Sequence, residues 1–164
     1  MAIIQTTPKK AVDDFLRAIP SIISGEIIRA FSYLGEQCVK KVRDRPGDKS
    51  WNDQTGNLRS SVGYAVYEEG RTIIESAFNV VGKGSFGSSE GKKMIEELAS
   101  KYAETYALVV VAAMEYADFV EAMKNKDVLA STELWAKREI NQYLDKSLER
   151  AYGKILKLQQ QLGL

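Results

Sequence analysis

The feature that most constrains the fold is a pair of long apolar stripes at helical spacing, one at each end of the chain. The first stripe follows Pro8, a residue that suits the first turn of a helix. Pro20 interrupts it and predicts either a kink in one helix or a break between two. The sequence therefore predicts an N-terminal helical segment over residues 8–44. Its stripe consists of Ala11, Phe15, Leu16, Ile19, Ile23, Ile27, Phe31, Leu34, Cys38 and Val42.

The second stripe predicts a C-terminal helix over residues 131–160, with Ser131 or Thr132 as its N-cap. A helix of that size is roughly 42 Å long at about 1.5 Å per residue. This exceeds what a small single-domain protein needs to cover one sheet. We therefore expect part of the helix to pack on another chain. The stripe consists of Ala136, Ile140, Tyr143, Leu144, Ser147, Leu148, Ala151, Ile155 and Leu158.

The middle of the chain, residues 55–121, has the composition of a sheet. Two runs rich in β-branched and aromatic residues, 62–67 and 71–78, flank Glu68-Glu69-Gly70, which has the length and the glycine of a hairpin turn. The apolar run 106–113 suits a buried strand. A flexible Gly- and Ser-rich loop over 79–91, followed by a short helix, is expected as an insertion at 79–105.

These elements predict an α+β fold: a small, mostly antiparallel β-sheet flanked by long N-terminal and C-terminal α-helices. The length of 164 residues suits a single domain, residues 1–164.

The numbers of histidine and cysteine residues exclude several classes of enzyme and metal site. The chain has no histidine and one cysteine, Cys38, which excludes Ser-His and Cys-His nucleophile pairs, thiolate zinc clusters and internal disulfides. Cys38 lies on the apolar stripe, so we expect a buried, inert thiol. Most hydrolase and metalloenzyme classes are therefore excluded. The longest apolar run, 107–114, is too short for a membrane helix, so no membrane partner is expected.

The segment Gly82-Lys83-Gly84-Ser85-Phe86-Gly87 matches the G-x-G-x-x-G pattern of phosphate-binding loops. The other sequence motifs of kinases are missing, and a doubly wound fold needs more strand–helix units than this chain supplies. We expect this segment to be a surface loop between two secondary-structure elements. Nucleotide binding remains the alternative function from a different class.

Two charged clusters have both structural and functional interpretations. Glu115, Asp118 and Glu121 would meet only on a helix, whereas their surroundings favour a strand, so solvated or intersubunit acids are expected rather than a cation site. Lys40, Lys41, Arg43 and Arg45 complement the dipole at a helix C-terminus, and contact with nucleic acid is the alternative. The net charge of +1 gives no overall preference for polyanions.

Two short motifs carry a family resemblance. The first is T-G-x-L-R-x-S, with Thr55, Gly56, Leu58, Arg59 and Ser61; the second is Y-A-x-x-V-E, with Tyr116, Ala117, Val120 and Glu121. In these motifs and in the order of its elements over about residues 10–160, the chain resembles the small neck or tail-completion (head–tail joining) proteins of long-tailed bacteriophages. The insertion at 79–105 and the long N-terminal helical segment depart from the simplest members.

The resemblance implies a structural virion protein that is not an enzyme and has no catalytic residues, cofactor or metal. The chain would be a subunit of a homo-oligomeric ring at the head–tail junction, assembled in the host cytoplasm. Its partners would be copies of itself and adjacent neck, connector or tail proteins, with DNA passing through the lumen without sequence-specific binding. A tail terminator ring is the alternative within this class. The candidate interface residues are Thr55, Gly56, Leu58, Arg59, Gly82, Gly84, Phe86, Gly87, Tyr116, Ala117 and Glu121.

Overall fold

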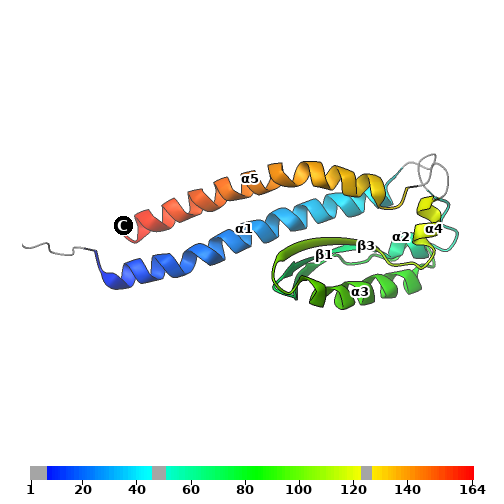
Figure 1. Cartoon of the computed structure of the whole chain (residues 1–164), viewed down its shortest axis with the longest axis horizontal. Coiled ribbons are helices and arrows are strands. Elements are labelled where there is room, and N and C mark those ends of the chain that lie inside the picture. The colour runs from blue at the N-terminus through cyan, green and yellow to red at the C-terminus, as the bar shows by residue number, and fades with distance from the viewer. Residues whose placement is uncertain (1–6, 46–50, 123–126) are drawn as a thin grey trace, which may run out of the picture. The chain divides into compact units, whose positions relative to one another are not determined.

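The computed structural model describes residues 7–45, 51–122 and 127–164. The chain has the expected α+β fold, with a three-stranded antiparallel sheet and a long helix toward each end (Figure 1). In chain order the elements are α1 (Lys9–Arg43), α2 (Asn57–Ser60), β1 (Val62–Glu68), β2 (Arg71–Glu75), α3 (Ser85–Ala99), η1 (Ser100–Tyr102), β3 (Tyr106–Ala112), α4 (Ala117–Ala122) and α5 (Ala130–Gln161).

Contacts divide the chain into two compact units. The first unit combines the chain up to Ala30 with Gln142–Leu164, and the second is Phe31–Asn141. Helices α1 and α5 each contribute one part to both units. The single-domain assignment over residues 1–164 stays a prediction.

The first unit is a pair of helical segments joined by buried charge. Pro20 lies inside α1 without ending it, so the N-terminal stripe forms one continuous helix. The Glu26 carboxylate is buried and accepts from Arg150 Nε and Lys154 Nζ, each at 2.7 Å. The hydrogen bonds from Lys154 and Arg150 lower the pKa of Glu26, outweighing its burial, which alone would raise it. Glu26 thereby ties α1 to α5 within this unit.

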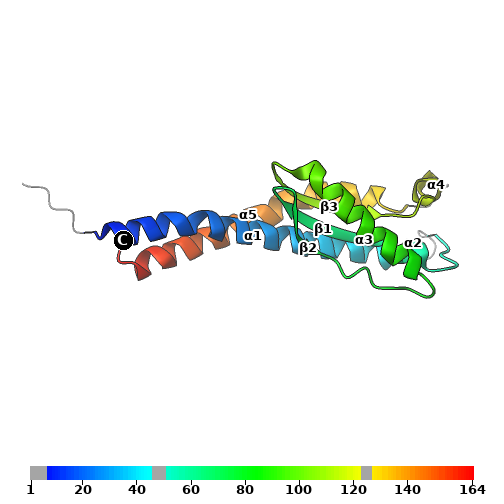
Figure 2. The ribbon, with the colours of Figure 1, turned by 90° about the horizontal axis from the view of Figure 1, so that it is seen from below.

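The sheet of the second unit has the order β2-β1-β3, with antiparallel pairing throughout (Figure 2). The β1–β2 hairpin turns at Glu69 and Gly70, with φ of 49° and 78°. Positive φ at both central positions belongs to the type I′ turn, which matches strand twist and favours glycine. The β1–β3 register is regular from Val62↔Ala112 to Glu68↔Tyr106.

Strand β2 is shorter than the sequence indicates. It ends at Glu75, so the prediction of a strand reaching Phe78 is wrong over its last residues. Phe78 adopts a φ of 47° and turns its buried ring back under the sheet. The ring occupies the space that a Cβ at Gly63 or Gly91 would need. The apolar character of Phe78 thus reflects core packing outside a strand.

The sheet is covered on both faces within the second unit. Helix α3 packs on one face, where Tyr67 donates its hydroxyl hydrogen to the Ile95 carbonyl at 2.6 Å. Burial raises the Tyr67 pKa to about 12. The core on this face comprises Ala65, Tyr67, Phe78, Ile95 and Val111, with partly buried Met94, Leu98, Ala99, Tyr102, Ala107 and Val109 around it.

The opposite face meets the C-terminal part of α1. The Tyr64 ring fills the space beside Gly35, and its hydroxyl lies 3.0 Å from Glu36 Oε1 and 3.1 Å from Ser32 Oγ. Leu34, Cys38 and Val42 are buried on the same stripe of α1, which confirms the expectation of a buried Cys38.

Candidate interface

The T-G-x-L-R segment folds as an ordered entry into the sheet. Gly56 has a φ of 82°, a left-handed conformation that glycine adopts without strain. The single turn of α2 follows, and both Leu58 and Val62 are fully buried. Leu58 and Val62, four residues apart, thus anchor this helical turn on the core.

The Gly-rich segment packs directly against this entry. A Cβ at Gly84 would lie 2.6 Å from the carbonyl carbon of Gly56, and a Cβ at Gly87 would lie 2.6 Å from that of Asn57. Contacts this short leave room for glycine alone. The expectation of a flexible loop over 79–91 is therefore wrong after residue 84, where α3 begins. These glycines allow the close approach of α3 to α2.

Backbone amides of the Gly-rich segment already have partners. Val81 donates to Ser60 Oγ at 2.8 Å, and Lys83 donates to the Thr55 carbonyl at 3.0 Å. Gly87 donates to Asn57 Oδ1 at 3.1 Å. A phosphate-binding loop needs amides that point at its ligand. These three amides instead join the Gly-rich segment to the T-G-x-L-R segment.

Asp53 organises the same segment, although sequence patterns did not single it out. Its carboxylate accepts from the backbone amides of Gly56 at 2.9 Å and Arg59 at 2.8 Å. The Arg59 guanidinium lies 5.1 Å from the Trp51 ring centroid and donates to the Arg43 carbonyl. An Asp three residues before a glycine in a turn is the sequence signal for a carboxylate that accepts hydrogen bonds from the backbone amides of the turn.

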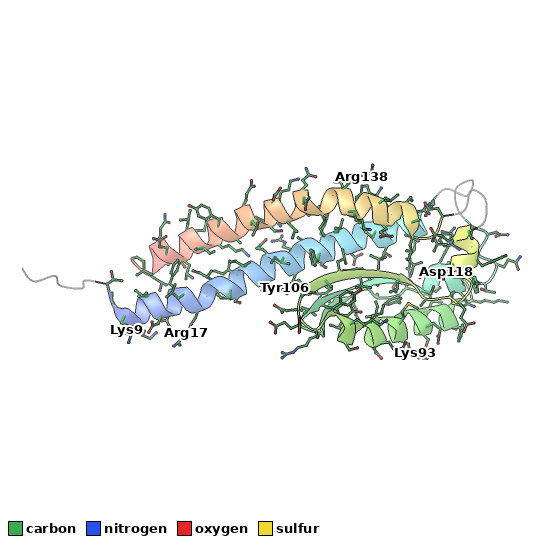
Figure 3. The ribbon with its side chains drawn as sticks, in the orientation of Figure 1. Lys9, Arg17, Lys93, Tyr106, Asp118 and Arg138 are labelled. Atoms are coloured by element: carbon green, nitrogen blue, oxygen red, sulfur yellow. The ribbon has the colours of Figure 1, made fainter. Side chains whose placement is uncertain are left out.

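The second motif reaches the first through Tyr116. Its side chain is hydrogen-bonded to Thr55, and its pKa is raised by burial and by the nearby Asp53 charge. Ala117 is buried and begins α4, so the expected strand character around 115–121 is wrong. Figure 3 shows Asp118 on this short helix. Tyr116 therefore lies close to Thr55, and Ala117 follows it at the buried start of α4.

Glu121 has a different role. Its carboxylate accepts from the amides of Leu129 at 2.9 Å and Ala130 at 2.8 Å, where α5 begins. A negative group here satisfies unpaired amides and complements the helix dipole. Glu121 is thus a capping residue. The expected N-cap, Ser131 or Thr132, lies inside α5, and both hydroxyls accept instead from Arg45 at 3.1 Å.

The basic cluster is largely engaged within the second unit. Arg43 donates to the Val62 carbonyl at 3.0 Å, and burial lowers its pKa. Arg45 pairs with Asp127 at 3.0 Å, and Lys41 lies 4.5 Å from the Trp135 ring centroid. These contacts give the cluster a structural role. Among residues 7–45, 51–122 and 127–164, no three acidic or cysteine side chains gather as metal ligands would.

Five exposed apolar side chains lie within or close in sequence to the two motifs and the Gly-rich segment. We call them the apolar end: Val80, Val81, Phe86, Tyr116 and Phe119. Val81 lies against Gly56, Phe86 precedes Gly87, and Tyr116 contacts Thr55. Phe86 is 58% exposed and Phe119 is 68% exposed.

No protein-family model, curated protein or solved structure matched the chain in comparisons with known proteins. In the described part of the chain, no helix is both long enough and apolar enough to span a membrane.

Proposed function

We propose that the chain is a structural subunit of a ring at the head–tail junction of a bacteriophage. The observation that carries the proposal is the convergence of the motifs. Thr55 and Gly56 meet the Gly-rich segment on one side and Tyr116 on the other. Residues far apart in the sequence thus build a single surface, and that surface carries the apolar end.

The mechanism is binding geometry. In a ring, the apolar end of one copy packs on a different surface of the next copy, a heterologous contact that closes by rotation. Phe86, Tyr116 and Phe119 supply the aromatic area that is enriched in protein interfaces. The hydrogen bonds that fix Gly87 and Lys83 hold this surface ready before association, which lowers the ordering cost. Repeated contacts around the ring hold a closed ring together more firmly than any single contact would.

A tail terminator ring is the alternative within the class, and adjacent neck, connector or tail proteins are the further partners. Nucleotide binding by Gly82–Gly87 is less favoured, because the amides of Lys83 and Gly87 are hydrogen-bonded to Thr55 and Asn57. Nucleic-acid binding by Lys40–Arg45 is less favoured for the same kind of reason, since Arg43 and Arg45 bind groups within the chain.

Electron microscopy of the concentrated, purified chain tests the proposal. We expect closed rings with a central opening in the wild-type sample. The Phe86→Ser and Phe119→Ser double variant should show few or none, whereas Leu134→Ser, which changes an apolar residue of 63% exposure outside the apolar end, should retain them. Open filaments, or equal loss of rings in both variants, would argue against the proposed interface.

A further inference from the structure

In the first unit, helices α1 and α5 meet along a seam of small and charged residues. The buried residues of this unit, within the described ranges 7–30 and 142–164, are Glu26, Ala30, Ser147 and Ala151. Every large apolar side chain in these two ranges is at least partly exposed. Paired helices are stabilised chiefly by burial of their apolar stripes, which this seam provides only in part.

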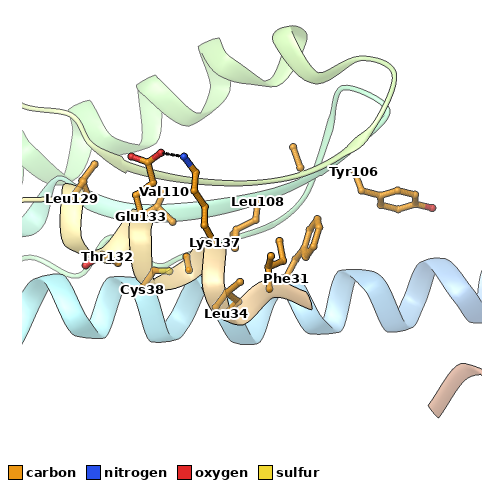
Figure 4. Close-up of a pocket in the computed structure, with 13 residues that line it drawn as sticks. Phe31, Leu34, Cys38, Tyr106, Leu108, Val110, Leu129, Thr132, Glu133 and Lys137 are labelled. Carbon is orange, nitrogen blue, oxygen red and sulfur yellow. Dashed lines mark ion pairs between the residues drawn. The ribbon is translucent and has the colours of Figure 1, made fainter. Parts of the chain in front are cut away.

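The second unit has a third layer that covers the stripe of α1. Phe31, Leu34 and Cys38 of α1 are buried there, and they line a cavity of about 450 Å³ together with β3 and the start of α5 (Figure 4). In its described part the first unit contains segments of α1 and α5 and no strand. An amphipathic element must bury its apolar face against another layer. The first unit therefore needs a layer that its own two helices do not supply.

The surface that awaits such a layer is continuous on α5. Leu148, Tyr152 and Leu156 are 53%, 64% and 39% exposed, and they follow one another at intervals of four residues. At about 3.6 residues per turn, residues with this spacing lie side by side on one flank of a helix. This flank adjoins the buried positions Ser147 and Ala151 of the seam.

Helix α1 has a flank of the same kind. Leu16 is 58% exposed, and Ile23 and Ile27 are partly exposed. The three residues are separated by seven and by four positions, which is the spacing of one helix face. Both helices of the first unit therefore have apolar side chains beside the seam as well as within it.

The two flanks lie on the same side of the helix pair. Ile27 directly follows the buried Glu26 on α1, and Tyr152 directly follows the buried Ala151 on α5. The two helices run antiparallel in this unit (Figures 1 and 2). When right-handed helices face each other antiparallel, the residue after each facing position turns toward the same side of the pair. We call this surface the helix face: Leu16, Ile23, Ile27, Leu148, Tyr152 and Leu156.

The other side of α5 is basic. Away from the helix face, positive residues recur at helical spacing: Lys146, Arg150, Lys154 and Lys157. An apolar surface packed on this row would take charges out of water without pairing them. A head-to-tail stack of first units is therefore unfavourable, whereas the helix face of a second copy is an apolar surface of matching extent.

The charged border of the helix face is complementary to itself. Asp145 and Glu149 lie near Leu148, at one end of the α5 flank, and Lys157 lies next to Leu156 at the other end. A two-fold axis across the helices would align α5 of two copies antiparallel, which brings the acidic end of each flank to the basic end of the other. Opposite charges at the rim of an interface fix its orientation.

We infer that the helix face binds the helix face of a second copy, and that the two first units form an antiparallel four-helix bundle. The contact is isologous, with the same surface used on both copies. It goes beyond the proposed ring, whose contacts are heterologous, and does not depend on it. It also identifies which part of the long C-terminal helix packs on another chain.

Sedimentation equilibrium of the full chain tests the inference. In the Phe86→Ser and Phe119→Ser double variant the apolar end is removed, and we expect a dimer of twice 18.3 kDa. Adding Leu148→Gln, Tyr152→Gln and Leu156→Gln should weaken dimerisation at least about tenfold while helical content by circular dichroism stays unchanged, since glutamine is a good helix former. The matched control Leu134→Gln, an exposed leucine of α5 in the second unit, should leave the dimer intact.

A charge exchange tests the orientation of the pair without altering its apolar residues. In the same double variant, Asp145→Lys with Glu149→Lys should weaken dimerisation, and adding Lys157→Glu should restore it, because opposite charges then meet again. A fold defect would not be repaired by a third surface substitution. A double variant that is monomeric at every concentration, dimerisation unchanged by the three glutamines, or absence of charge rescue overturns the inference.

The failure of this inference and that of the proposed function are distinguishable. The dimer is measured without the apolar end, so a negative result there leaves the ring standing. With the apolar end intact, the three glutamine substitutions should leave closed rings in electron micrographs. Loss of rings in that variant would show that the helix face is itself the ring contact, and would overturn the isologous arrangement.

Discussion

The backbone of Gly87 passes so close to that of Asn57 that a Cβ at residue 87 would stand 2.6 Å from the Asn57 carbonyl carbon. The same glycine donates its amide hydrogen to Asn57 Oδ1 at 3.1 Å. The backbone of α3 therefore packs directly against that of the α2 turn, and a hydrogen bond from a backbone amide to a side-chain oxygen joins the two. A glycine pattern typical of ligand-binding loops serves helix packing here.

Gly87→Ala should lower the free energy of unfolding by about 3 kcal/mol, the upper part of the range for overpacked sites, since the neighbouring atoms belong to the backbone. Gly153→Ala is the matched control, because residue 153 lies inside α5 and a Cβ there would have open space around it. This control should raise stability by up to about 1 kcal/mol. Chemical denaturation of both variants checks the pair, and similar effects would contradict the packing account.

Glu26 should make stability depend on pH. Its pKa is lowered in the folded chain by hydrogen bonds from Lys154 and Arg150. The stabilisation is therefore complete above the ordinary pKa of 4.5 and is lost as the pH falls through the lower folded-state value. The difference in unfolding free energy between wild type and Glu26→Gln should be largest near neutral pH and shrink in acid. A difference in unfolding free energy between the two proteins that stays constant with pH would contradict this role of Glu26.

Arg45 should be hard to replace, even by lysine. Its side chain is 9% exposed and binds Asp127 together with the hydroxyls of Ser131 and Thr132. A lysine ammonium lacks the planar fork that reaches several acceptors at once. Arg45→Lys and Arg45→Ala should each cost about 2–4 kcal/mol, whereas Arg17→Ala on the exposed surface should cost less than about 0.5 kcal/mol. An Arg45→Lys variant as stable as the wild type would show that the positive charge alone matters.

The apolar end should control self-association without controlling folding. Phe86→Ser and Phe119→Ser alter exposed side chains, so each should change the melting temperature little while weakening association at least about tenfold. Sedimentation velocity across a dilution series measures this. Leu134→Ser should sediment as the wild type does, and weakening of the same size in that control would remove the apolar end from the interface.

Sequence patterns predicted the parts of the fold that follow from local periodicity. The stripes of α1 and α5, the Gly70 turn and the buried Cys38 each have a signal within a few neighbouring residues. The convergence of Thr55, Gly87 and Tyr116 has no such signal, because tertiary packing brings these residues together. The glycines also misled the prediction of helix α3, since Gly87 and Gly91 weaken a helix by propensity but are required by the contacts they make.

Glu121 and Asp53 illustrate the same limit at the level of single residues. Each acts on backbone amides, Glu121 across an interval of eight residues and Asp53 across its own turn. The sequence marked Glu121 as an interface acid by its motif, whereas its contacts assign it to the start of α5. A capping contact between residues of two different helices cannot be predicted from the spacing of residues along one helix.

The native mass of the purified chain, measured across a concentration series, tests the central claim most directly. The ring account predicts one discrete species at a fixed integer multiple of 18.3 kDa, which dissociates on dilution and in the Phe86→Ser and Phe119→Ser double variant. A mass of 18.3 kDa at every concentration would contradict that account.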